Sequence, residues 1–115
     1  MSAERMRRVD EAVREVISDA LSRDVKDPRV GFVTVTDVKT SADLRHARVH
    51  VSVLGDPAER EESLEGLRSA HGFLQGRVGG ELRLKRTPAL EFVHDDTAAR
   101  AARVERLLAE TEDER

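Results

Sequence analysis

With 115 residues, a net charge of −3 and no cysteine, the chain has room for one domain with a modest core, and disulfides, a thiol nucleophile and a Cys-ligated zinc are excluded. No apolar run approaches the ~18 residues of a membrane span and no signal peptide is apparent, so we expect a soluble, cytoplasmic protein. Aromatic residues are only 3 %, so Val, Leu, Ala and Ile must build the core around Phe32, Phe73 and Phe92.

The first predicted element is an amphipathic helix over residues 4–24. Its apolar residues recur in steps of three and four, which is the spacing of one helix face. These residues are Met6, Val9, Val13, Val16, Ile17, Ala20 and Leu21. The Asp27-Pro28 pair ends the helix, because the residue before Pro is disfavoured in helical conformation.

Two strands follow. Residues 32–38 are rich in β-branched side chains that alternate with polar ones, which predicts a first strand. In residues 46–53, four apolar side chains alternate strictly with His46, Arg48, His50 and Ser52. This period of two indicates a strand with one buried face and one wet face.

Gly55-Asp56-Pro57 predicts the start of a second helix, with Asp56 as N-cap and Glu59 completing a capping box. Gly72 interrupts that helix, so we expect a helix, a kink and another helix. A third strand follows at residues 90–94, and Asp96 or Thr97 caps a final helix. The apolar residues of that last helix are Ala101, Val104, Leu107 and Leu108.

The order helix, strand, strand, helix, kinked helix, strand and terminal helix predicts an α+β fold, with helices packed on one face of a three-stranded sheet. We expect one domain at residues 1–110 and a frayed acidic end at 111–115. The predicted inner layer consists of Val33, Val35, Val49, Val51, Val53, Leu67, Phe73, Val78 and Phe92.

The sequence offers no catalytic constellation and no metal site. His46 and His50 lie four apart on one strand, roughly 13 Å from each other, too far to share one metal directly. Asp95-Asp96 is better explained as a helix N-cap than as a carboxylate pair. No phosphate-binding glycine loop is present either.

The basic residues indicate a function more clearly than the histidines and carboxylates do. Of the 20 basic residues, 17 are Arg, whose planar group suits bidentate and stacking contacts. Residues 95–115 hold seven acidic and four basic side chains, so they account for the whole negative excess. The candidate phosphate contacts are Arg45, Arg48, Arg77, Arg83, Lys85 and Arg86, and then Arg5, Arg7 and Arg8 on the first helix. Such clusters are also typical of solvated faces neutralised by neighbouring carboxylates.

Several segments, in order, resemble the ribosome-binding factor A family. Residues 25–36 read Val-Lys-Asp-Pro-Arg-Val-Gly-Phe-Val-Thr-Val-Thr, and residues 47–55 read Ala-Arg-Val-His-Val-Ser-Val-Leu-Gly. Residues 41–44 read Ser-Ala-Asp-Leu, and residues 70–74 read Ala-His-Gly-Phe-Leu. Residues 82–92 read Leu-Arg-Leu-Lys-Arg-Thr-Pro-Ala-Leu-Glu-Phe. The resemblance extends from about residue 5 to residue 108.

The resemblance implies a type II KH-like fold in which an interhelical kink, here Ala70-His71-Gly72, replaces the GxxG loop. It implies a non-enzymatic factor without cofactor that binds the small (30S) ribosomal subunit through 16S rRNA. The resemblance also implies a role in late maturation of the subunit and in processing of the 5′ end, and a link to growth in the cold. The chain departs from the family pattern at Ala101, where a Gly-like position is expected, and in its short acidic end.

The role of the kink stays open between RNA contact and structure. We expect Ala70 and Gly72 to let the helix ends approach, and Gly72 to supply unusual backbone angles. The alternative function is a protein-interaction module that docks a ribosomal protein or an assembly GTPase through the acidic helix at residues 56–75 or through the exposed edge of the sheet. No heptad pattern or surface apolar patch demands a dimer, so we expect a monomer.

Overall fold

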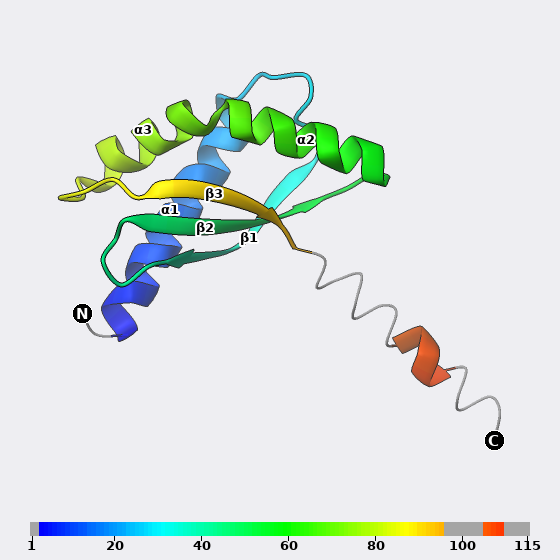
Figure 1. The fold of residues 1–115 in the computed structure, drawn as a ribbon, viewed down its shortest axis with the longest axis horizontal. Coiled ribbons are helices and arrows are strands. Elements are labelled where there is room, and N and C mark those ends of the chain that lie inside the picture. Colours follow the sequence, from blue (N-terminus) through cyan, green and yellow to red (C-terminus); the bar gives the residue numbers. More distant parts are fainter. Residues whose placement is uncertain (1–2, 96–104, 110–115) are drawn as a thin grey trace.

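The computed structural model describes residues 3–95 and 105–109 of the chain. Its main elements are α1 (Ala3–Arg23), β1 (Val33–Thr40), β2 (His46–Val53), α2 (Pro57–Ser69), α3 (His71–Leu82) and β3 (Ala89–His94) (Figure 1). The predicted α+β class and the order of these six elements are confirmed. Among the described residues, no helix has the length and apolar character to span a bilayer.

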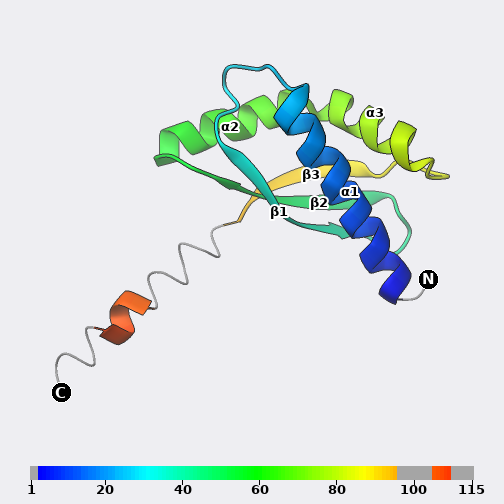
Figure 2. The ribbon, with the colours of Figure 1, turned by 180° about the vertical axis from the view of Figure 1, so that it is seen from behind.

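The sheet has the strand order β1-β2-β3. β1 and β2 form an antiparallel hairpin, whereas β3 lies parallel to β2, so α2 and α3 form the crossover between them. Buried residues of α1, α2 and α3 join the inward side chains of the strands in one core. Figure 2 shows α1 in front of the strands, on the side hidden in Figure 1. Within residues 3–95, no helix packs against the opposite sheet face, which carries the outward side chains His46, Arg48 and His50 of β2 and which we call the uncovered face.

A bulge in β1 changes which side chains face the core. The register with β2 shifts between Val35 and Asp37. The extra residue lets Val35 and Val38 both point inward, where they are 5 % and 1 % exposed, although they are three positions apart. Strict alternation over 32–38 therefore fails in the second half of this strand.

The capping box at the start of α2 is confirmed. The Asp56 carboxylate accepts a hydrogen bond from the backbone N–H of Glu59 at 2.8 Å, and Glu59 accepts one in return from the N–H of Asp56 at 3.4 Å. The Glu59 N–H lowers the pKa of the Asp56 carboxyl. Pro57 occupies the first turn, where its missing N–H costs nothing.

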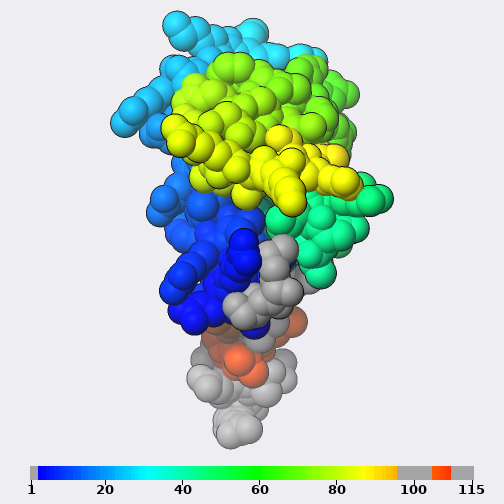
Figure 3. Space-filling view, turned by 90° about the vertical axis from the view of Figure 1, so that its left-hand side faces the viewer, coloured from blue at the N-terminus to red at the C-terminus, as the bar shows by residue number. Residues whose placement is uncertain are grey.

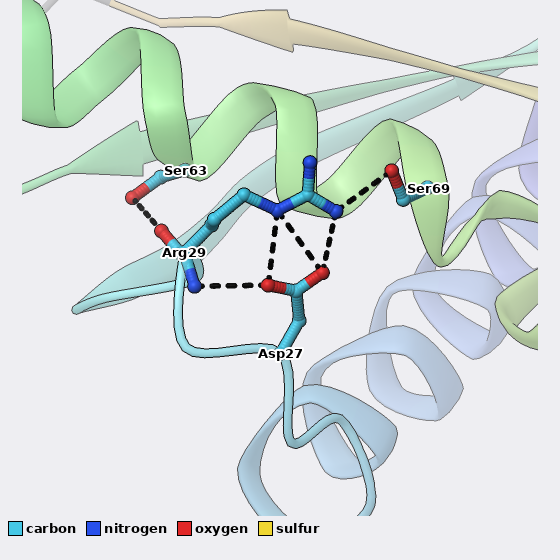
Figure 4. Close-up of polar contacts among 4 residues, drawn as sticks. All are labelled: Asp27, Arg29, Ser63 and Ser69. Atoms are coloured by element: carbon cyan, nitrogen blue, oxygen red, sulfur yellow. Dashed lines mark hydrogen bonds and ion pairs between the residues drawn. The ribbon is translucent and has the colours of Figure 1, made fainter.

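A polar cluster joins the loop between α1 and β1 to α2 (Figure 4). The Arg29 guanidinium donates to the Asp27 carboxylate at 2.7 Å and to the Ser69 hydroxyl at 2.9 Å. Ser63 donates to the Arg29 carbonyl at 3.2 Å. The Arg29 side chain lowers the pKa of Asp27 to about 2, with help from its backbone N–H. The Asp-Pro-Arg motif of the family resemblance thus has a structural role.

The core is made of aliphatic side chains, as predicted, but two of the three phenylalanines lie outside it. Phe92 is 5 % exposed, whereas Phe32 is 81 % and Phe73 47 % exposed. The expectation that Phe32 and Phe73 build the core is wrong. Phe32 precedes the first paired residue of β1, and the buried residues of α3 are Leu74 and Val78, four positions apart on one helix face. Val33 is half-buried at the edge of the core.

The C-terminal part of the chain is described only at residues 105–109. These residues are helical, and Leu107 and Leu108 are 56 % and 59 % exposed. The predicted caps Asp96 and Thr97, the apolar residues Ala101 and Val104, and the predicted frayed end at 111–115 lie outside the described residues.

Candidate nucleic-acid interface

Three of the predicted phosphate contacts come together at one end of the sheet. The register that pairs His46 with Ala89 brings the starts of β2 and β3 side by side. The loop between β1 and β2 therefore meets the loop between α3 and β3, and the Ala89 N–H donates to the Arg45 carbonyl at 2.8 Å. Figure 3 looks onto this end, with the yellow loop beside the teal one. A hollow of about 460 Å³ there is lined by Asp43, Leu44, Arg45, Lys85 and Arg86.

Hydrogen bonds within the loop between β1 and β2 fix its conformation. Ser41 donates to the Asp43 carboxylate at 2.6 Å, and the Arg45 N–H donates to it at 3.0 Å. Both hydrogen bonds lower the pKa of Asp43, the serine hydroxyl most, with a smaller contribution from the Arg45 charge. Leu44 takes a positive φ of 59° to close the turn. Arg45 is thereby held at the rim of the hollow.

The cations of the second loop, between α3 and β3, have no carboxylate partner among residues 3–95 and 105–109. Within the described part of the chain, Arg83, Lys85 and Arg86 form no ion pair, and all three are exposed. Arg45 lies 3.8 Å from Asp43, a distance typical of a weak exposed pair. We call Arg45, Arg83, Lys85 and Arg86 the basic end. Its charge is available to an anionic partner.

The arginines of α1 have mixed surroundings. Arg7 lines a shallow hollow of about 70 Å³ with Lys39 of β1, next to Asp10, Glu11 and Asp37. Arg8 pairs with Glu4 at 3.1 Å, and Arg5 is exposed. These residues follow the edge of β1 and are interleaved with carboxylates. They form a less basic surface than the loop cations do.

Arg77 is not part of the basic end. Its guanidinium binds Asp24 at the end of α1 and Glu81 on its own helix, at 2.5 and 3.1 Å, and it lies 5.8 Å from the centre of the Phe73 ring. The hydrogen bond with Asp24 is the main cause of its raised pKa. Arg77 thus joins α1 to α3, and its charge is already matched by two carboxylates.

Arg48 lies apart from the basic end as well, on the uncovered face of the sheet. Its guanidinium is 4.0 Å from the Glu91 carboxylate of β3. Together with Lys39, His46 and His50 it lines a shallow hollow of about 300 Å³. The nine predicted residues therefore fall into separate groups, and only three of them line the hollow at the basic end.

The interhelical kink lies at the predicted position in the sequence, but its backbone conformation differs from the prediction. Ala70 ends α2 and precedes α3, and its carbonyl accepts from the Leu74 N–H at 3.0 Å. Gly72 has no positive φ, and a Cβ added there would meet no atom within 4 Å. The expectation that Gly72 supplies unusual angles and avoids a side-chain collision is wrong, because it sits in an ordinary, open turn of α3.

One basic residue near the kink was missed by the sequence interpretation. Arg68 of α2 and His71 line a hollow of about 280 Å³ against the outer edge of β3, beside Leu90, Glu91 and Phe92. Arg68 pairs with Glu61 at 3.5 Å, a weak exposed pair. Arg68 lies one helical turn before His71 in the sequence, and this spacing could have identified it as a residue near the kink. The hollow joins the kink to the β3 edge.

Among the described residues, no three His, Cys, Asp or Glu side chains are close enough to hold a metal ion. His46 and His50 are both on β2, with His71 at the start of α3 and His94 at the end of β3.

Comparison with known proteins matches residues 5–108 to the family model "Ribosome-binding factor A". A ribosome-binding factor A from Halothermothrix orenii is 45 % identical over 114 residues, which cover 99 % of this chain and 93 % of that protein. The solution structure of a putative ribosome binding factor A from Thermotoga maritima is 35 % identical, with a TM-score of 0.74, over 84 % of this chain and 92 % of the other. A Thermus thermophilus model fitted into a map of a 30S complex is 23 % identical, with a TM-score of 0.66, over 78 % and 94 %. The chain belongs to the ribosome-binding factor A family.

Proposed function

We propose that this protein is a non-enzymatic assembly factor that binds the immature small (30S) ribosomal subunit through 16S rRNA. It supports the late maturation of the subunit and the processing of the 5′ end, acts in the cytoplasm as a monomer and needs no cofactor. Family membership supports this proposal, as does the 30S complex into which the Thermus thermophilus relative was fitted. On this proposal residues 1–110 are a KH-like RNA-binding domain, and the acidic end repels RNA.

The observation that carries the proposal is the basic end. Arg83, Lys85 and Arg86 have no carboxylate partner in the described part of the chain, and Arg45 joins them across a hollow. Cations from two loops that meet in this way can contact several phosphates of one folded RNA. Guanidinium groups also suit the bidentate recognition of phosphate oxygens.

The mechanism follows from binding energy alone. A factor that binds an immature subunit more tightly than a mature one shifts the equilibrium between them by the ratio of the two affinities. Folded RNA is recognised by its shape, phosphates and 2′-hydroxyls. The basic end supplies the phosphate contacts, and the kink with Arg68 and His71 is a second candidate contact.

Charge reversal tests the proposal. In Lys85→Glu/Arg86→Glu we expect weaker binding to free small subunits, and a log–log salt slope that is shallower by about two, since each lost phosphate contact removes about one. The matched control Arg23→Glu/Lys26→Glu makes the same charge change at the C-terminal end of α1 and in the loop that follows it, where both side chains are exposed. Equal loss in both variants, or none in the first, would contradict an RNA-binding basic end.

A second function is favoured by the exposed acidic side chains of α2. Glu61, Glu62 and Glu65 are all exposed and can dock a basic ribosomal protein or an assembly GTPase. Binding of purified 16S rRNA separates the two functions, because only the first predicts that Lys85→Glu/Arg86→Glu weakens binding to naked RNA.

A further inference from the structure

The face of the sheet opposite the helices carries an unusual set of planar groups. Along β2, His46, Arg48 and His50 alternate with the buried Ala47 and Val49, so all three project from the uncovered face. Residues two apart on a strand are roughly 7 Å apart, so two imidazoles flank one guanidinium over roughly 13 Å. They line the hollow of about 300 Å³ described above.

The charges on this face cancel one another, unlike those of the basic end. Lys39 and Arg48 are neighbours across β1 and β2, and Arg48 and Glu91 across β2 and β3. Lys39 lies 3.9 Å from Asp37, and Arg48 lies 4.0 Å from Glu91. Each cation therefore has a carboxylate at the outer limit of an ion pair. A phosphate backbone gains little from such a surface, since each carboxylate would repel it.

Unpaired bases fit this surface better than phosphates do. Bases splayed out of a single strand stack on imidazole rings and on guanidinium planes. A carboxylate such as Glu91 accepts hydrogen bonds from the exocyclic amino group of a base. The hydroxyls of Thr34 and Ser52, paired across the same face, add further polar groups.

We propose that the uncovered sheet face, formed by His46, Arg48, His50 and Glu91, binds a single-stranded segment of RNA through two or three of its bases. The proposal rests on the RNA-binding function proposed above, and it assigns a different part of the RNA to a different part of the protein. The basic end holds folded RNA by its phosphates, and the sheet face holds unpaired nucleotides. Amino-bearing bases are preferred to uracil, because an exocyclic amino group offers two N–H donors to the Glu91 carboxylate, whereas uracil offers only its N3–H.

The test uses the full chain and fluorescent twelve-nucleotide oligomers of cytidylate and uridylate, with binding measured by anisotropy. We expect cytidylate to bind more tightly than uridylate, and His46→Ala/His50→Ala to weaken it at least tenfold, since each lost stack costs fivefold or more. The matched control is His94→Ala, because His94 follows the alternation of the buried Leu90 and Phe92 and so faces away from this surface. Glu91→Gln should reduce the preference for cytidylate several-fold.

Backbone amide shifts on addition of the oligomer locate the site. Shifts in β2 and at Glu91, with a salt slope shallower than that of subunit binding, support the proposal. It is overturned if the oligomer does not bind, if His46→Ala/His50→Ala binds it like the wild type, or if the shifts are confined to residues 83–86. A wild-type protein that binds cytidylate but no small subunit would refute the proposed function and leave the sheet-face site standing.

Discussion

Replacing Gly72 by Ala should stabilise the protein, although the kink motif suggests the opposite. Gly72 is the second residue of α3, has no positive φ and leaves open space where a Cβ would stand. A glycine in a helix interior costs about 0.5–1 kcal/mol relative to alanine, so the variant, whose change lies in the first turn, should gain up to that amount. For a domain of this length the gain corresponds to a rise of roughly 2–5 °C in the Tm.

Gly66→Ala provides the matched contrast within α2. A Cβ at Gly66 would come within 2.7 Å of the Val30 side chain and 3.4 Å of its backbone nitrogen, so the loop before β1 must shift. Overpacking of this kind costs about 1–3 kcal/mol. Thermal unfolding followed by circular dichroism measures both variants. A lower Tm for Gly72→Ala would refute the conformation described for the kink.

The same Gly72→Ala variant decides the open role of the kink. If its Tm rises while its affinity for small subunits falls, the kink contacts RNA closely enough to exclude a methyl group. If the Tm rises and the affinity for small subunits is unchanged, a methyl group at Gly72 disturbs neither the fold nor the binding of RNA.

Three further predictions concern stability. Asp27→Asn removes the negative charge and one of the two acceptor oxygens that bind Arg29. Because the folded pKa of Asp27 is lowered from 3.8 to about 2, the stability deficit of the variant relative to wild type should be constant above about pH 4 and shrink as the pH falls towards 2, as urea titrations at several pH values will show. Leu67→Ala should lower the free energy of unfolding by about 2–5 kcal/mol, because Leu67 is 0 % exposed in the core; a loss under 1 kcal/mol in denaturant titration would contradict that packing. Arg48→Ala should change stability by less than about 0.5 kcal/mol, since its pair with Glu91 is exposed and 4.0 Å long, and a larger loss would show that the pair is structural.

Local patterns predicted the elements well because local interactions decide them. The alternation over 46–53 placed Ala47, Val49, Val51 and Val53 in the core, and the capping box at Asp56 was visible as four consecutive positions. The bulge in β1 was not visible, because it depends on the pairing of Asp37 with His50 of another strand. Phe73 was misplaced since helical spacing allowed two faces for α3, and only the packed fold selects the one with Leu74 and Val78.

The candidate site was predictable in composition but not in arrangement. Arg45 and Lys85 are distant in the sequence, and they meet because β3 pairs in parallel with β2 from His46 and Ala89 onward. Arg77 stands near Arg83 in the sequence, yet Asp24, 53 positions away, binds its guanidinium. The basic residues of the sequence alone therefore could not show that Arg45 and Lys85 lie together while Arg77 is bound to a carboxylate at the end of α1.

The position of each carboxylate, more than the count of arginines, decides what each arginine does. Arg29 and Arg77 are bound by Asp27 and Asp24 and serve the fold, whereas Arg86 has no such partner in the described part of the chain. The net charge of −3 is a poor guide to RNA binding for the same reason. At physiological ionic strength charges are screened over about 8 Å, so an RNA bound at the proposed basic end would respond mainly to the cations beside it. Remote carboxylates, such as those of α2, oppose binding only when the salt concentration is low enough to extend their reach.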